Sequence, residues 1–169
     1  FQMIIKATKK HGILRSVFSF IDASAIVRKE TTWAERDKAI AEGEAKLNNE
    51  NIKDYSADEE ARFGCKGKDK FWFGYKRHHN VDMGSGLIQK VVVTKANVPD
   101  HKALKHICPK EGMVLADKGY ATHAAHRQLK QNGCHSGIIL KNNMKDKNHD
   151  KDKWLTRLRS PFENTFSKM

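Results

Sequence analysis

The order of the apolar segments along the chain constrains its fold more than any other sequence feature. An apolar segment at 16–21 is followed by two segments rich in strand-forming residues, 71–81 and 87–93, which the turn-like residues DMGSG separate. This order predicts one strand and then a β-hairpin. The rest of the chain alternates between helical and short apolar segments, with helices expected at 101–107, 122–132 and 154–166 and strands at 112–116 and 137–140.

This alternation predicts an α/β fold with a mixed sheet of about five strands flanked by helices. Residues 32–47 have a thin apolar stripe typical of an exposed helix, and the basic, glycine-containing segment 62–70 predicts a loop. We therefore interpret residues 28–70 as a helical insertion after the first strand. The length fits a single domain over 1–169, and we expect both ends to be truncated, because the first residue is Phe1 and the final helix has apolar residues near its end.

The formal net charge of +12 indicates a polyanionic partner, because the lysines and arginines are spread through most of the chain. Basic charge by itself specifies no partner, so a merely solubilising surface is the alternative. No apolar segment approaches the roughly 20 residues that span a bilayer, and the three cysteines lack the spacing of a zinc site or a disulfide framework. A cytoplasmic protein without a membrane partner is expected.

Two aspartates follow predicted strands directly, Asp22 after 16–21 and Asp117 after 112–116. The ends of neighbouring strands meet at one edge of an open sheet, so these carboxylates lie together if their strands are neighbours. Clustered carboxylates repel one another unless a cation neutralises them, and Mg²⁺ prefers such hard oxygen ligands. Glu163, on the last predicted helix, is the third candidate ligand. Three such acids are suited to phosphodiester cleavage with two metal ions.

Each of these acids also has a structural interpretation. Asp22 and Asp117 could end a strand or form a turn, which are common roles of aspartate. Ser160, Pro161 and Glu163 form the pattern of a helix start with a capping box, in which Glu163 would bond to the backbone instead.

Other polar residues are expected to be structural. Asp82 fits the hairpin turn and Asp100 a helix cap. His78 and His79 are adjacent in a strand and face opposite sides, so they are not expected to bind one metal together.

Three short motifs carry a resemblance to a known family. They are FIDASAIV around Asp22, ADKGYAT around Asp117 and RSPFENTF around Glu163, and the block FWFGYKRHHNVDMGSGLI lies between the first two. In this order they resemble the DDE transposases of bacterial insertion sequences, in families four and five. The firmest match is the D-x-G-Y motif formed by Asp117, Gly119 and Tyr120, and the resemblance covers nearly the whole chain from about Phe18.

The resemblance implies a ribonuclease H-like fold in which Asp22, Asp117 and Glu163 bind Mg²⁺, with Mn²⁺ able to substitute. Arg159 matches the arginine of the family's signature around the glutamate, whereas Thr156 stands at the position of its tyrosine. The partner implied is double-stranded DNA, both transposon ends and target, in the bacterial nucleoid, with a homodimer on DNA as the assembly to test. Expected DNA contacts are Arg159, Lys118 and Lys76.

The leading hypothesis is therefore a DNA transposase that cleaves and transfers strands of an insertion sequence. A ribonuclease H-like nuclease is an alternative with similar chemistry, but it would not join the freed 3′ end to a second duplex. A non-catalytic basic nucleic-acid-binding domain, or an inactive transposase remnant, is the alternative from a different class. Lys66, Lys68, Lys70 and Lys76 could contact phosphates, and the sequence leaves open which of them do.

Overall fold

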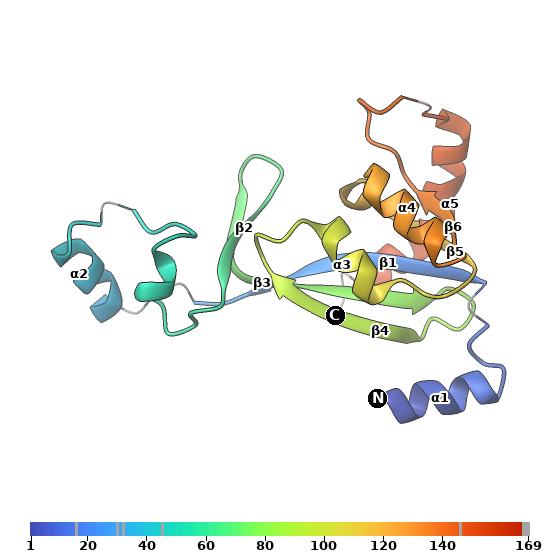
Figure 1. The fold of residues 1–169 in the computed structure, drawn as a ribbon, viewed down its shortest axis with the longest axis horizontal. Helices are drawn as coiled ribbons and strands as arrows, with labels where there is room; N and C mark the ends of the chain where they lie inside the picture. Colours follow the sequence, from blue (N-terminus) through green and yellow to red (C-terminus); the bar gives the residue numbers. More distant parts are fainter. Residues whose placement is uncertain (16, 30, 32, 45, 146, 167–169) are drawn as a thin grey trace. The chain divides into compact units, whose positions relative to one another are not determined.

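The computed structural model describes residues 1–166 except 16, 30, 32, 45 and 146, and for residues 33 and 163–166 it describes the backbone only. No helix in the described part is long and apolar enough to cross a membrane. The helices are α1 (Gln2–Lys10), α2 (Trp33–Ala41), α3 (Asp100–Ile107), α4 (His123–Gln131) and α5 (His149–Phe166), with 3-10 turns η1 (Ile52–Asp54) and η2 (Lys118–Tyr120) (Figure 1). The strands are β1 (Phe18–Val27), β2 (Arg62–Lys66), β3 (Lys70–Asp82), β4 (Ile88–Lys95), β5 (Met113–Ala116) and β6 (His135–Ile138).

The strands form one mixed sheet in the order β2-β3-β1-β5-β6, and β4 also pairs with β3. Strand β5 is parallel to both β1 and β6, whereas β2 is antiparallel to β3. Asp82 forms the turn between β3 and β4, because its carboxylate accepts hydrogen bonds from the backbone N–H and the hydroxyl of Ser85 at 2.9 and 2.6 Å. The predicted mixed α/β fold and the predicted hairpin are confirmed.

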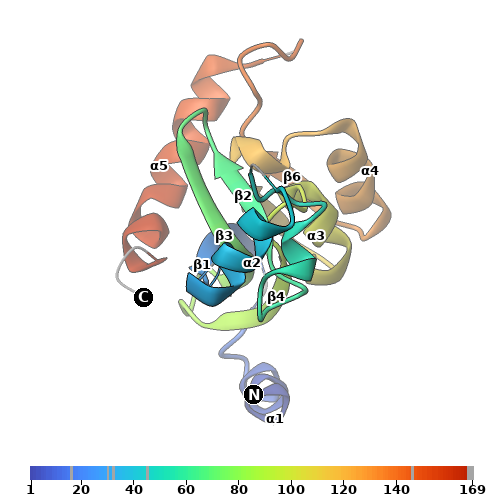
Figure 2. The same ribbon diagram turned by 90° about the vertical axis from the view of Figure 1, so that its left-hand side faces the viewer.

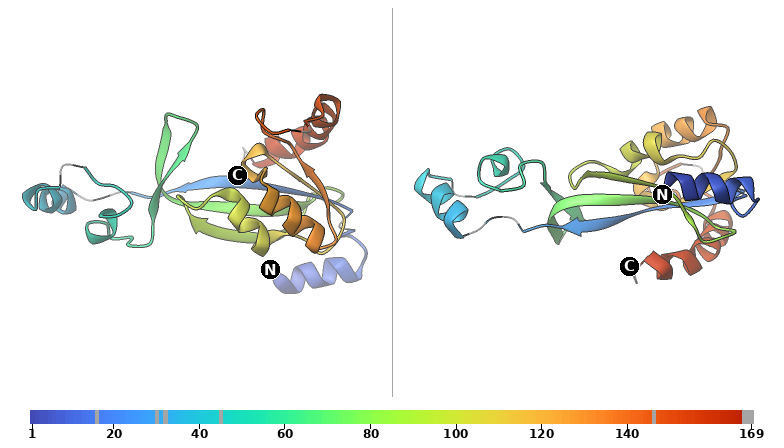
Figure 3. Two further views of the ribbon diagram at one scale, coloured as in Figure 1. Left: turned by 45° about the horizontal axis from the view of Figure 1, so that its top comes forward. Right: turned by 90° about the horizontal axis from the view of Figure 1, so that it is seen from below.

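Helices cover both faces of the parallel strands, as Figures 2 and 3 show. On one face, α3 and α4 bury Leu104, Ile107 and Leu129 against Ile21 and Val114. On the other face, α5 packs against β1 and β5 with side chains that include Leu155, Phe20, Leu115 and Phe162. A strand buried on both faces has side chains from successive residues in two different cores, which explains why apolar residues follow one another in β5 and at Phe20 and Ile21 of β1.

The chain divides into two compact units, and each is described by itself. The first unit comprises residues 1–23, 78–92 and 99–169, and the second comprises 24–77 and 93–98. The second unit has a small core of its own, formed by Ile52, Ala61 and Phe73 with partly buried neighbours.

Several local predictions are wrong in informative ways. Strand β1 continues to Val27, so Asp22 lies within the strand and not at its end. Helix α2 ends at Ala41, shortly before Gly43, whose φ of 86° is outside the helical range. Residues 62–66 form strand β2 and not a loop, because they pair with β3, and the sheet therefore has six strands.

Candidate catalytic site

The pairing of β1 with β5 brings Asp22 and Asp117 to adjacent strands of the first unit. Ile21 is the register partner of Ala116, and each aspartate is the next residue along the chain, Asp22 within β1 and Asp117 directly after β5. Neighbouring strands lie about 4.8 Å apart, and side chains two residues apart share a face. Asp22 is therefore on the face of Phe20, whose ring lies 6.4 Å from that of Phe162 on α5. The expectation that these two strands are neighbours is confirmed.

Helix α5 contacts Asp117 directly. The guanidinium of Arg159 donates a hydrogen bond from Nη1 to Oδ1 of Asp117 at 3.1 Å, which is also an ion pair. The Arg159 side chain is 11% exposed and that of Asp117 is 51% exposed, so the cation is largely enclosed and the carboxylate faces solvent. Arg159 thus orients one oxygen of Asp117 and leaves half of that side chain accessible.

Position 163 lies one turn after Arg159 on α5, because residues four apart share a face of a helix. The side chain of Glu163 is outside the described residues. Since α5 begins at His149, Ser160 and Pro161 lie inside the helix and do not start it. The capping-box interpretation of Glu163 is therefore wrong, because position 163 is not in the first turn.

The pKa of the Asp117 carboxyl is lowered overall. Partial burial raises it, but the backbone hydrogen bond at Lys118 and the hydrogen bond and charge of Arg159 together outweigh that effect. A lowered pKa keeps the carboxyl group ionised at neutral pH. Asp117 is therefore in the charge state that a metal ligand needs.

A buried tyrosine lies close to both aspartates. Tyr120 is 1% exposed, and its hydroxyl is 2.9 Å from Nδ1 of the fully buried His78 on β3. Burial raises the pKa of Tyr120, and the charges of Asp100, Asp22 and Asp117 raise it further. Three carboxylates therefore act on one phenol group, although they come from three different elements.

Asp100 also lies near this site, although the sequence predicted it to be a helix cap. Pro99 is the N-cap of α3, and Asp100 is the first residue of the helix, so the prediction that Asp100 caps α3 is wrong. A Cβ at Gly119 would lie 2.8 Å from Oδ2 of Asp100, so glycine in the D-x-G-Y motif allows this carboxylate to approach. No sequence pattern links these residues, since they meet only in three dimensions.

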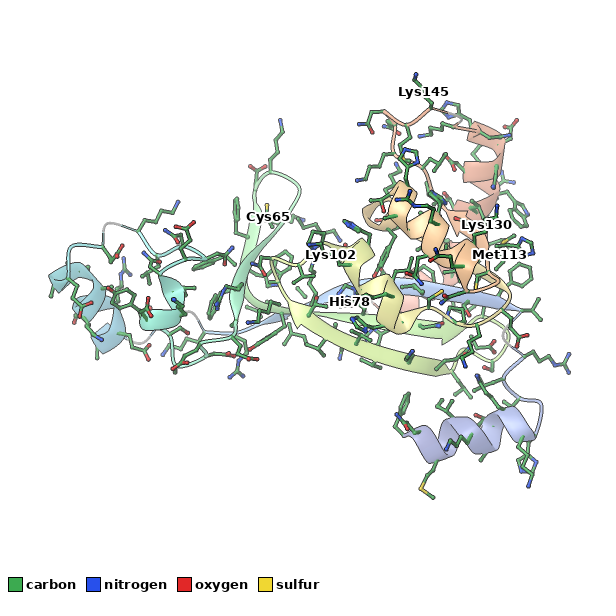
Figure 4. All side chains as sticks on the ribbon, in the orientation of Figure 1. Cys65, His78, Lys102, Met113, Lys130 and Lys145 are labelled. Atoms are coloured by element: carbon green, nitrogen blue, oxygen red, sulfur yellow. The ribbon has the colours of Figure 1, made fainter. Side chains whose placement is uncertain are left out.

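The two histidines of β3 are buried, and the two lysines predicted to contact DNA belong to different units. His78 and His79 are 0% and 3% exposed, because both faces of this part of β3 are covered. Lys118 is exposed directly after Asp117, whereas Lys76 is half-buried in the part of β3 that belongs to the second unit. Figure 4 labels His78 within the sheet.

Among the side chains that the structure describes, no group of three or more His, Cys, Asp or Glu residues is arranged to hold a metal ion. The candidate third ligand, Glu163, is outside that set. Asp22 and Asp117 each follow a residue of the register pair Ile21 and Ala116, and carboxylate oxygens are ligands that Mg²⁺ prefers.

The chain is similar in sequence to known transposases. Residues 15–168 match the family model described as the transposase DDE domain. Over 89 residues the chain is 34% identical to the transposase for insertion sequence element IS1106 of Neisseria meningitidis serogroup B. That alignment covers 51% of this chain and 30% of the relative, so the chain spans about a third of the relative's length. No solved structure matches the chain.

The family match over residues 15–168 gives the class of this protein. The chain belongs to the DDE transposase family. Its match runs through both aspartates and position 163, since the matched region covers nearly the whole chain.

Proposed function

We propose that the chain is the catalytic core of an insertion-sequence transposase that cuts and rejoins double-stranded DNA with the help of Mg²⁺. Asp22, Asp117 and Glu163 are the proposed metal ligands, and Arg159 is a proposed phosphate contact. The fold proposed is ribonuclease H-like, which is supported by three parallel strands beside a hairpin with helices on both faces.

The parallel pairing of Ile21 with Ala116 carries this proposal. It aligns the residues that precede two aspartates, which are 95 residues apart in sequence. The contact between Arg159 and Asp117 supports the same site, because it fixes α5 next to the second aspartate. Position 163 is then a turn away from a residue that touches the aspartate.

The carboxylates of Asp22 and Asp117 are suited to binding a divalent cation. Carboxylates on neighbouring strands repel one another, and Arg159 forms an ion pair with Asp117 at 3.1 Å. A bound Mg²⁺ would supply Lewis-acid activation of water and stabilisation of the leaving oxygen. In the proposed hydrolysis, the oxygen of water becomes bonded to the 5′ phosphate and the 3′ oxygen leaves as a hydroxyl group. The chain's own part is to hold the strands and orient Asp117 through Arg159.

The test of this function is a joining assay with the full-length protein that contains this chain. A labelled duplex carrying the ends of its own element is incubated with a plasmid and Mg²⁺, with EDTA as the control. A transposase produces 3′-hydroxyl ends and joined products. Cleavage without joining would favour the nuclease alternative, and binding without either product would favour the non-catalytic domain.

Glu163→Gln should abolish cleavage in that assay while the thermal unfolding temperature of the protein stays within a few degrees. Glutamine keeps the size and helix propensity of glutamate but is a poorer Mg²⁺ ligand. The matched control is Glu111→Gln, which makes the same change at an exposed position outside the proposed triad. Unchanged cleavage by Glu163→Gln would remove this residue from the site.

A further inference from the structure

The positive charge of the second unit is concentrated in residues 62–77, which we call the basic hairpin because they comprise β2, its turn and the first part of β3. This segment has six Lys and Arg side chains and one acidic side chain, a formal net charge of +5. The rest of the second unit has seven basic and ten acidic side chains, a net charge of −3. An otherwise acidic unit therefore presents one basic element.

Three lysines lie at the end of the basic hairpin. Lys66 pairs with Lys70 as the last register pair of β2 and β3, and Lys68 lies in the turn between them. All three are exposed, and Gly67 in the turn has a φ of 72°. Like charges directly opposite one another destabilise a strand pair, so Lys66 and Lys70 lower the stability of the hairpin in the isolated protein, which is a cost in free energy. A polyanion would remove that cost.

An aromatic side chain is exposed next to these lysines. Phe71 is 69% exposed, whereas Phe73 on the same face is 1% exposed and packs on Phe63 with ring centroids 5.2 Å apart. Phe71 and Phe63 line a cavity of about 720 Å³ together with residues that include Ile40. Phe71 thus lies beyond the small core of the unit. An exposed aromatic beside basic residues is typical of a surface that contacts nucleic acid.

We propose that the basic hairpin inserts into the major groove of double-stranded DNA, with Lys66, Lys68 and Lys70 on phosphates and Phe71 against apolar base edges. A two-stranded β-ribbon fits the width of this groove. Lysine contacts phosphate without a defined geometry, so the contact carries little sequence preference. This inference rests on the proposed function for its partner, and it adds a DNA contact outside the catalytic residues.

The first test is equilibrium binding of the chain to a labelled duplex in EDTA, where no cleavage occurs. Replacing Lys66, Lys68 and Lys70 with glutamine should weaken binding on the order of 100-fold at about 0.1 M salt, because each phosphate contact releases a counterion. The slope of log affinity against log salt should become shallower by about 2.7, at roughly 0.9 for each lysine.

The matched control is the triple glutamine variant of Lys29, Lys38 and Lys53, which removes the same charge from exposed positions of the same unit. It should retain nearly all of the affinity and slope. An equal loss in the two triple variants would mean that only overall charge matters, and it would overturn the proposal.

Phe71→Ala should weaken binding about 10-fold without changing the salt slope, because it removes an uncharged contact. Phe71→Trp should restore the affinity. Because Phe71 is mostly exposed, neither change should unfold the chain. Full affinity in Phe71→Ala would remove the aromatic contact from the proposal.

Cys65 offers a direct probe, because it is the register partner of Phe71 and is exposed (Figure 4). Cys108 and Cys134 are buried, and burial raises the pKa of Cys108 to about 12 and also raises that of Cys134. A maleimide should therefore modify Cys65 first. Duplex DNA should slow this reaction several-fold, and high salt should restore it.

These results separate the hairpin from the proposed enzyme activity. If the full-length protein cleaves and joins DNA while DNA leaves Cys65 unprotected, the hairpin inference is wrong and the transposase proposal stands. If DNA protects Cys65 in the absence of any cleavage activity, the hairpin inference stands and the non-catalytic interpretation is favoured.

Discussion

Replacing Asp117 with alanine should abolish Mg²⁺-dependent DNA cleavage, with a rate loss on the order of 10³-fold or more, because several kcal/mol of charge stabilisation would be removed. Asp117 is half exposed, it is held by Arg159 at 3.1 Å, and its pKa is lowered, so it is ionised and oriented. Asp117→Asn should be almost as inactive, because the amide keeps the shape of the side chain but lacks its charge.

The same variant should lose stabilisation by metal. At ten times its dissociation constant, a ligand that binds only the folded state adds about 1.4 kcal/mol of stability. For a chain of this size that gain raises the unfolding temperature by a few degrees. Titration of Mg²⁺ or Mn²⁺ should show this rise in the unaltered chain and in Asp37→Ala, an exposed control on α2. An equal rise in Asp117→Ala would exclude Asp117 as a metal ligand.

The local sequence pattern predicted the buried strands β1 and β5 as well as the hairpin of β3 and β4. Strand β5 and residues Phe20 and Ile21 of β1 have consecutive apolar side chains, as expected for strands that helices cover on both faces. Their adjacency was the basis for expecting Asp22 and Asp117 side by side, and the register of β1 with β5 agrees with it. The metal-binding role of these aspartates is still a prediction.

Elements that depend on a distant partner could not be predicted in this way. Strand β2 contains glycine and lysine, which are poor strand formers, and it exists because β3 pairs with it. The start of α5 has no apolar residue before Trp154, so the sequence pattern predicted a helix that begins at residue 154 and not at His149. There the side chain of Asn148 accepts a hydrogen bond from the backbone N–H of Lys151 at 2.9 Å and caps the first turn.

The side-chain contacts around the candidate site could not be predicted from the sequence either. His78 and Tyr120 are 42 residues apart in the chain, and they meet through a buried hydrogen bond and an edge-to-face ring contact. Asp100, at the start of α3, approaches Gly119, whereas the sequence around Asp100 predicted a helix cap. Such contacts depend on the packing of whole elements and leave no spacing to recognise.

Gly74→Ala should destabilise the chain by about 3 kcal/mol or more, because it combines backbone strain with a steric clash. Gly74 has a φ of 138°, a conformation that residues with a side chain rarely adopt. A Cβ at this position would lie 2.1 Å from the carbonyl oxygen of Ile26, which is backbone and has little freedom to move. The N–H of Arg28, bonded to the carbonyl of Phe73 at 2.8 Å, should then exchange faster with solvent.

The matched control is Gly67→Ala in the turn of the basic hairpin. Gly67 also has a positive φ, 72°, but a Cβ there would meet nothing within 4 Å, so only the conformational cost of about 1–2 kcal/mol applies. Urea unfolding followed by circular dichroism should therefore give a much larger loss for Gly74→Ala than for Gly67→Ala. Equal losses of stability in the two variants would mean that the clash with the Ile26 carbonyl does not destabilise the protein. In that case β1 and β3 would not be as close at Gly74 in solution as in the structure.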